Sequence, residues 1–232
     1  GLSHHTVTAL AESPVGQLWV GTLDGLNRYD GHGFTVFRHD LRDDRTLDSG
    51  RVRAIHAAES GDVWVGTTLG LNHIDGRTGR VERVPLRSAT GALLQGDTSC
   101  ILPDGEALWL CMGTALVHYL PSSAARVGEV RAFQHDDADP HSLWAGRIYR
   151  AVRAPDGSLW VVVGEGGFDH VVVRRSGNLV EGVRVEHFGS GTPGSPLSPS
   201  ARRGSRGPCA TGGPRWPSAC PEALKAWSPR GR

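Results

Sequence analysis

A tryptophan recurs at nearly constant intervals along most of the chain. Trp19, Trp64 and Trp109 are each 45 residues apart, and Trp160 follows after another 51. The segments that begin at the first two, WVGTLDGLNRYDG and WVGTTLGLNHIDG, agree at nine of thirteen positions. Such a period indicates one structural unit copied along the chain, in which each unit buries its core against its neighbours.

The apolar pattern within a unit is that of short strands. Apolar residues alternate or run briefly, and glycines, 32 in the whole chain, interrupt them. In the second unit we expect strands at 51–58, around Trp64, after a G-L-N turn at 70–72, and after a D-G turn, the last ending near Arg83. Four antiparallel strands per 45 to 51 residues are typical of a β-propeller blade. We therefore expect an all-β fold.

The chain divides by composition into two parts. Residues 1–189 hold the repeat and predict a partial propeller of about four blades. Residues 190–232 carry seven basic residues and one acid, together with 8 of the 14 prolines, and they lack Val, Ile, Phe and Tyr. We expect this Gly/Pro/Ser/Arg-rich tail to be disordered, either as a natural linker or as the product of an out-of-frame or truncated gene.

Charge and hydropathy exclude several classes of partner. The formal net charge is +1, which gives no reason to expect nucleic acid. No apolar run approaches the roughly 20 residues that span a bilayer, so we expect no membrane span. The chain begins with Gly1 and its one methionine is Met112, so a signal peptide would lie outside it.

The four cysteines favour neither zinc nor a redox motif. Within each pair, Cys100 with Cys111 and Cys209 with Cys220, the spacing is eleven residues, and no C-x-x-C occurs. The first pair flanks a predicted turn and could form a disulfide across a hairpin in a secreted protein. We expect two buried free thiols instead, because cysteine packs well as a small hydrophobe.

The repeated phrases resemble a known family. L-W-V-G-T-x-x-G-L-N-R-Y-D-G at 18–31 and its copy at 63–76 resemble the two-component regulator propeller repeat, and the resemblance covers about residues 1–188. It implies the periplasmic sensor region of a bacterial receptor whose output domain is a histidine kinase or a diguanylate cyclase. Because propellers of this family often have seven blades, we expect this chain to be a fragment, and we expect the receptor to be dimeric.

Eight repeated residues, four tryptophans, two glycines and two asparagines, have structural interpretations. The four tryptophans should cover the faces between blades. Gly25-Leu26-Asn27 and Gly70-Leu71-Asn72 should form turns, since asparagine tolerates left-handed backbone. The alternative is that Asn27 and Asn72 form a polar ring at the mouth of the propeller.

We find no motif for catalysis, a metal or a cofactor. His39 and His135 occupy equivalent repeat positions two units apart and would not converge on a metal, so we expect no metal site. G-x-S-x-G, Walker A and H-E-x-x-H are absent from the sequence. Arg51 and Arg147, in equivalent long connections, are the candidate ligand-binding residues.

These observations predict a non-catalytic, ligand-sensing propeller segment. The ligand would be a small molecule or an oligosaccharide, and the partner would be the rest of the receptor. One alternative is a propeller enzyme, a lyase or glycosidase-like hydrolase, with His56 or Asp97 as acid or base. The other is a protein-interaction scaffold.

Overall fold

The structure, a computed structural model, describes residues 1–88, 90–123, 128–164, 167–177 and 179–189. These residues form sixteen strands in four separate four-stranded antiparallel sheets and contain no helix. We call the sheets blades 1 to 4 in chain order. The predicted tail, 190–232, lies outside the described residues.

Each blade is built from four consecutive strands. Blade 1 has β1 (Val7–Glu12), β2 (Leu18–Thr22), β3 (Gly25–Tyr29) and β4 (Phe34–Phe37), and blade 2 has β5 (Val52–Ala57), β6 (Val63–Thr67), β7 (Leu71–Ile74) and β8 (Val81–Val84). Blade 3 has β9 (Thr98–Asp104), β10 (Ala107–Met112), β11 (Ala115–Leu120) and β12 (Glu129–Phe133), and blade 4 has β13 (Ile148–Arg153), β14 (Leu159–Val163), β15 (Gly167–Ser176) and β16 (Leu179–Gly189).

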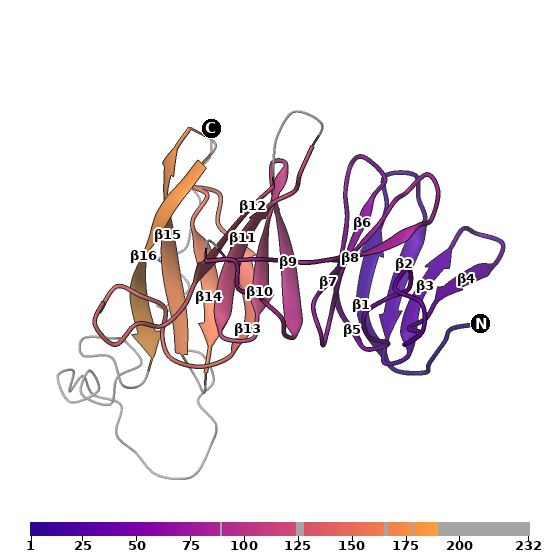
Figure 1. Ribbon diagram of the computed structural model, residues 1–232, viewed down its shortest axis with the longest axis horizontal. Helices are drawn as coiled ribbons and strands as arrows, with labels where there is room; N and C mark the ends of the chain where they lie inside the picture. The colour runs from indigo at the N-terminus through magenta and orange to yellow at the C-terminus, as the bar shows by residue number, and fades with distance from the viewer. Residues whose placement is uncertain (89, 124–127, 165–166, 178, 190–232) are drawn as a thin grey trace, which may run out of the picture.

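The strands of a blade pair in chain order, so each blade is a meander. The first strands, β1, β5, β9 and β13, contact one another in succession, and we call them the inner strands. Figure 1 shows the blades side by side in a row, from β1–β4 at one end to β13–β16 at the other. The predicted all-β architecture of about four four-stranded units is confirmed.

The core consists of three apolar clusters, one between each pair of adjacent blades. Trp19 of blade 1 packs with Val52 and Val63 of blade 2, and Trp109 of blade 3 packs with Leu159 of blade 4. Trp64 of blade 2 packs against the apolar cluster that lies between blades 2 and 3. Each blade therefore has a back face, which carries its tryptophan, and a front face, which covers the tryptophan of the preceding blade.

Two glycines after the tryptophans allow adjacent blades to approach closely. A Cβ on Gly21 would lie 2.5 Å from Cγ1 of Val52, and one on Gly66 would lie 2.5 Å from the backbone oxygen of Thr98. Both contacts cross from one blade to the inner strand of the next. Glycine is needed here because any side chain would push the two sheets apart.

The expectation of two free thiols is wrong. Cys100 on β9 and Cys111 on β10 are directly opposite in the antiparallel register, with Cα atoms 5.0 Å apart, and they form a disulfide. That separation is within the range that a disulfide spans. Spacing alone could not decide the redox state, because it depends on the register between the strands.

Candidate functional site

The asparagines of the G-L-N phrases do not form local turns, so that expectation is wrong. Asn27 lies in β3 and Asn72 in β7, and both are fully buried. Asn27 Oδ1 accepts a hydrogen bond from the backbone N of Ser3 (2.8 Å), and Asn72 Oδ1 accepts one from the backbone N of Asp48 (3.0 Å). Each asparagine thus ties the connection that leads into a blade to that blade's third strand.

The glycine of the second phrase, Gly70, makes room for Asp48, the residue that Asn72 holds. A Cβ on Gly70 would lie 2.9 Å from Oδ2 of Asp48. Asn72 Nδ2 also donates to Oδ1 of Asp48 (2.7 Å). In blade 4 a carboxylate takes the place of the asparagine: Asp169 Oδ2 accepts a hydrogen bond from the backbone N of Trp144 (2.8 Å). Asn27, Asn72 and Asp169 thus hold in place the connections that lead into blades 1, 2 and 4.

A histidine or arginine packs on each repeated tryptophan. His73, His118 and His170 lie with ring centroids 4.6, 4.8 and 4.4 Å from Trp64, Trp109 and Trp160, respectively, and Arg28 lies over Trp19. His170 Nε2 also lies 2.9 Å from Ser158 Oγ, which donates to Asp156. His73 and His118 occupy the same position in blades 2 and 3, where they contact Asp62 and Asp104. The contact of His170 with Ser158 is therefore the blade 4 version of a repeated packing contact.

A buried carboxylate joins blades 3 and 4. Asp104, whose side chain is 5% exposed, accepts hydrogen bonds from Trp109 Nε1 (3.1 Å) and His118 Nε2 (3.2 Å). It also pairs with Arg153 (3.0 Å) and Arg175 of blade 4. Burial would raise the pKa of Asp104, but the hydrogen bonds from His118 and Arg175 and the positive arginine charges outweigh it and hold that pKa well below its ordinary value.

All four inner strands carry a β-bulge near the same end. The register shifts leave Thr8, Arg53, Ser99 and Tyr149 as the extra residues. A bulge re-aims a side chain, and the same bulge in every blade places four such residues around the inner strands. We call this end of the inner strands, with the connections that lead into them, the mouth.

Charged residues from three blades meet at the mouth. Asp97, just before β9, pairs through Oδ1 with Arg53 of blade 2 (2.9 Å) and through Oδ2 with Arg147, just before β13. The carboxylate is 13% exposed, whereas the arginine side chains are 39% and 44% exposed. One negative charge thus holds two half-exposed guanidinium groups, whose other N–H donors suit a carboxylate or a similar acceptor.

The two arginines that the sequence predicts to bind a ligand have different surroundings in the structure. Arg147 lies in this cluster, whereas Arg51 is exposed and makes no ion pair with Asp97 among the described residues. Sequence reasoning missed Arg53, because its direction depends on the bulge in β5. A bulge leaves no reliable signal in a single sequence.

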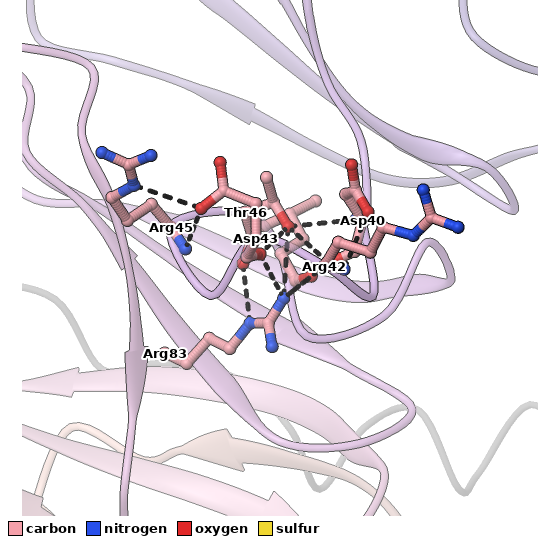
Figure 2. A network of polar contacts seen from close by, with 7 residues as sticks. Asp40, Arg42, Asp43, Arg45, Thr46 and Arg83 are labelled. Atoms are coloured by element: carbon pink, nitrogen blue, oxygen red, sulfur yellow. Dashed lines mark hydrogen bonds and ion pairs between the residues drawn. The ribbon is translucent and has the colours of Figure 1, made fainter.

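The long connection between blades 1 and 2 is held by an arginine of the outer strand. Arg83 on β8 donates to the backbone oxygens of Thr46 (2.9 Å) and Asp43 (2.8 Å), and Figure 2 shows its guanidinium pointing into the turn that these residues form. A groove of about 460 Å³ runs beside this connection. It is lined mainly by apolar side chains, including Leu41, Leu69 and Leu93.

The two acid–base candidates do not come together. Asp97 is engaged by arginines, and His56 lies in β5 with its pKa lowered by burial. His39 and His135 each bond through Nδ1 to a backbone oxygen of their own connection, at 2.7 and 2.8 Å. Within the part of the chain that the structure describes, no group of three or more His, Cys, Asp or Glu is placed to hold a metal.

By sequence comparison, part of the chain matches the family that the repeats resemble. Residues 1–24 match the family described as two component regulator propeller. A curated protein of Formosa agariphila, histidine kinase P4, is 45% identical over 47 residues, which is 20% of this chain and 3% of that protein. The predicted resemblance is confirmed, and the chain spans a small part of that relative.

Comparison by structure finds the same fold. The extracellular domain of a hybrid two-component system from B. thetaiotaomicron superposes with a TM-score of 0.63 at 21% identity, over 81% of this chain and 25% of that one. A second such domain from B. thetaiotaomicron gives 0.58 at 19% identity, over 72% and 24%. These likenesses establish the propeller fold, and this chain spans about a quarter of either solved domain. Among the described residues, no helix has the length and hydropathy to cross a membrane.

Proposed function

We propose that this chain is a ligand-sensing propeller segment of a bacterial two-component receptor and that its ligand binds at the mouth. The observation that carries the proposal is the contact of Asp97 with Arg53 and Arg147, which brings groups from three blades to one place. A ligand bound there contacts several blades at once and alters how they pack. That is how a sensor biases an output domain between two states.

The charges at the mouth favour an acidic ligand. Asp97 neutralises one of two guanidinium groups, and both arginine side chains remain partly exposed. Arginine binds planar acids through paired N–H donors. The proposed ligand is therefore a small molecule or oligosaccharide that carries a carboxylate or similar group, and Arg51 is available as a second contact.

The resemblance to sensor kinases supports the receptor context. The sequence relative is named as a histidine kinase, and the solved domains are named as extracellular parts of hybrid two-component systems. The output domain is proposed to be a histidine kinase, with a diguanylate cyclase as the alternative. Catalysis by this chain is not proposed, because no observation favours it.

Thermal unfolding in the presence of probe ligands tests the site. Uronic-acid oligosaccharides and small organic acids should raise Tm, and neutral oligosaccharides should not. Arg147→Ala should remove the shift, and Arg77→Ala should keep it, because Arg77 lies in the β7–β8 turn at the opposite end of blade 2. A shift that survives Arg147→Ala, or no shift with any acidic probe, contradicts binding at the mouth.

The disulfide supports a periplasmic location. Disulfides form and persist in oxidising compartments. In a Cys209→Ser, Cys220→Ser variant expressed with a secretion signal, Cys100 and Cys111 should resist a thiol-alkylating reagent until a reductant is added. Alkylation without reductant would contradict both the disulfide and this argument for the location.

A further inference from the structure

A hollow of about 620 Å³ lies between blades 2 and 3. Its lining includes Asp62 in the β5–β6 turn, at the end of β5 that is far from the mouth. Trp64 of blade 2 and Tyr119 of blade 3 also line it, and their rings lie edge to face with centroids 5.8 Å apart. Both blades have a neighbour on either side, so the hollow belongs to an internal interface of the propeller.

A departure from the repeat makes this interface more open than its neighbours. In blades 1 and 3 a phenylalanine of the outer strand packs on the tryptophan, with ring centroids 5.6 Å apart for Phe37 and 5.9 Å apart for Phe133. The same register position in blade 2 holds the smaller Val84. Trp64 is accordingly partly exposed, whereas the tryptophans of blades 1 and 3 are 2% and 0% exposed. Departures from a consistent pattern are expected at functional sites.

The charged side chains that line the hollow are mainly acidic. Glu82 is exposed, lies beside His73 in the sheet, and forms no ion pair within the described part of the chain. The Asp62 side chain is 36% exposed and lies 3.6 Å from His73 Nε2. Arg87 also lines the hollow, but its guanidinium donates to a backbone oxygen of its own connection (3.2 Å). With His73 neutral, two carboxylates face one guanidinium.

The interface between blades 3 and 4 shows what fills an equivalent place. There Arg175 of blade 4 pairs with Asp104, the carboxylate that contacts the tryptophan and the histidine of blade 3. The pairing of the third strand with the second makes Ser123 the counterpart of Arg175 in blade 3. Serine carries no charge, and no described cation of blade 3 pairs with Asp62 or Glu82. The carboxylates of blade 2 therefore lack the arginine that Asp104 has.

We propose that the hollow between blades 2 and 3 binds a small organic cation, a guanidinium or ammonium group on a short apolar chain, in the place that Arg175 fills at the next interface. The cation pairs with Glu82 and Asp62, since carboxylates bind such groups through charge-assisted hydrogen bonds. Its chain lies against Trp64 and Tyr119, whose rings also attract positive charge. This site goes beyond the proposed function, because it is separate from the mouth and selects the opposite charge.

Isothermal titration calorimetry of the full chain with agmatine tests the proposal. Agmatine carries a guanidinium, an ammonium and no carboxylate, so it should bind one to one, and more weakly as salt is added. Glu82→Gln should lower the affinity about tenfold or more. Val84→Phe restores the residue of the neighbouring blades, closes the hollow and should abolish binding. Glu12→Gln, at an exposed acid of blade 1, is the matched control and should bind as the wild type does.

Circular dichroism checks that each variant is folded, and Arg147→Ala separates this site from the mouth, because it should leave agmatine binding unchanged. A wild type that does not bind agmatine overturns the proposal. So does an affinity that survives both Glu82→Gln and Val84→Phe. Binding of maltose in place of agmatine assigns the hollow to neutral sugars and overturns the choice of a cation. Tighter binding of a blocked peptide, acetyl-Gly-Arg-Gly-amide, than of agmatine assigns it to an arginine of a protein partner and overturns the choice of a small molecule.

Discussion

Replacing Asp104 removes a buried charge that joins blades 3 and 4. Its carboxylate is 5% exposed and takes donors from Trp109, His118, Arg153 and Arg175, so Asp104→Asn keeps the shape but removes the charge. Stripping one partner from a buried ion pair costs about 3–5 kcal/mol, because it leaves uncompensated charge. An amide oxygen still accepts one hydrogen bond, so we expect a loss of about 3 kcal/mol, the lower end of that range.

The pH dependence of this loss provides a second check. The pKa of Asp104 is lowered in the folded protein, so its contribution to the unfolding free energy is complete above the unfolded pKa of about 3.9 and is lost as the pH falls below it. Urea unfolding of the wild type and Asp104→Asn should therefore differ by a constant amount from pH 7 to about pH 4. The difference should shrink at lower pH.

A matched surface pair is the control for this experiment. Asp137 and His135 form an ion pair at 2.9 Å, but the Asp137 side chain is 100% exposed, so Asp137→Asn should leave the unfolding free energy unchanged within error. The reasoning is refuted if Asp104→Asn is as stable as the wild type at pH 7. It is also refuted if the difference persists undiminished at pH 3.

Three further perturbations, one reduction and two substitutions, test the packing between and within blades by urea unfolding. Reduction of the Cys100–Cys111 disulfide should lower the unfolding free energy by about 2–3 kcal/mol, the chain-entropy value for so short a loop; an unchanged value would mean that the two thiols are free in the native protein. Gly66→Ala should cost about 1–3 kcal/mol by forcing blades 2 and 3 apart, whereas Gly33→Ala, which meets nothing within 4 Å, should cost little; equal effects would contradict the close approach. Asn72→Ala should cost about 2–3 kcal/mol by leaving buried polar groups of the blade 2 connection unpaired, and a neutral effect would return this asparagine to a local turn role.

Much of the architecture was predictable because a blade is a local structure. Its four strands are consecutive in the chain, and short turns join most of them, so apolar alternation and glycine punctuation near Trp64 were enough to place β5 to β8. The repeat then implied stacking, because a sheet with two apolar faces must cover both.

The candidate site was less predictable, because its residues belong to different blades. Arg147 was nominated, but its contact with Asp97, and that of Arg53 with the same carboxylate, depend on a β-bulge and on the stacking of three sheets. Asn72 was assigned to a turn, although its amide reaches a connection 24 residues earlier in the chain. Contacts of this kind have no local signal in the sequence.

The amino-acid sequence by itself determined the blade, its period and the faces that must be buried, since these follow from side-chain alternation over neighbouring residues. Only the tertiary structure decided which side chains meet: the disulfide across β9 and β10, the carboxylate shared by blades 3 and 4, and the charged cluster at the mouth. The physical reason is that these contacts depend on strand register and on the packing of one sheet against the next. Both are settled by the free energy of the whole assembly and not by any single segment.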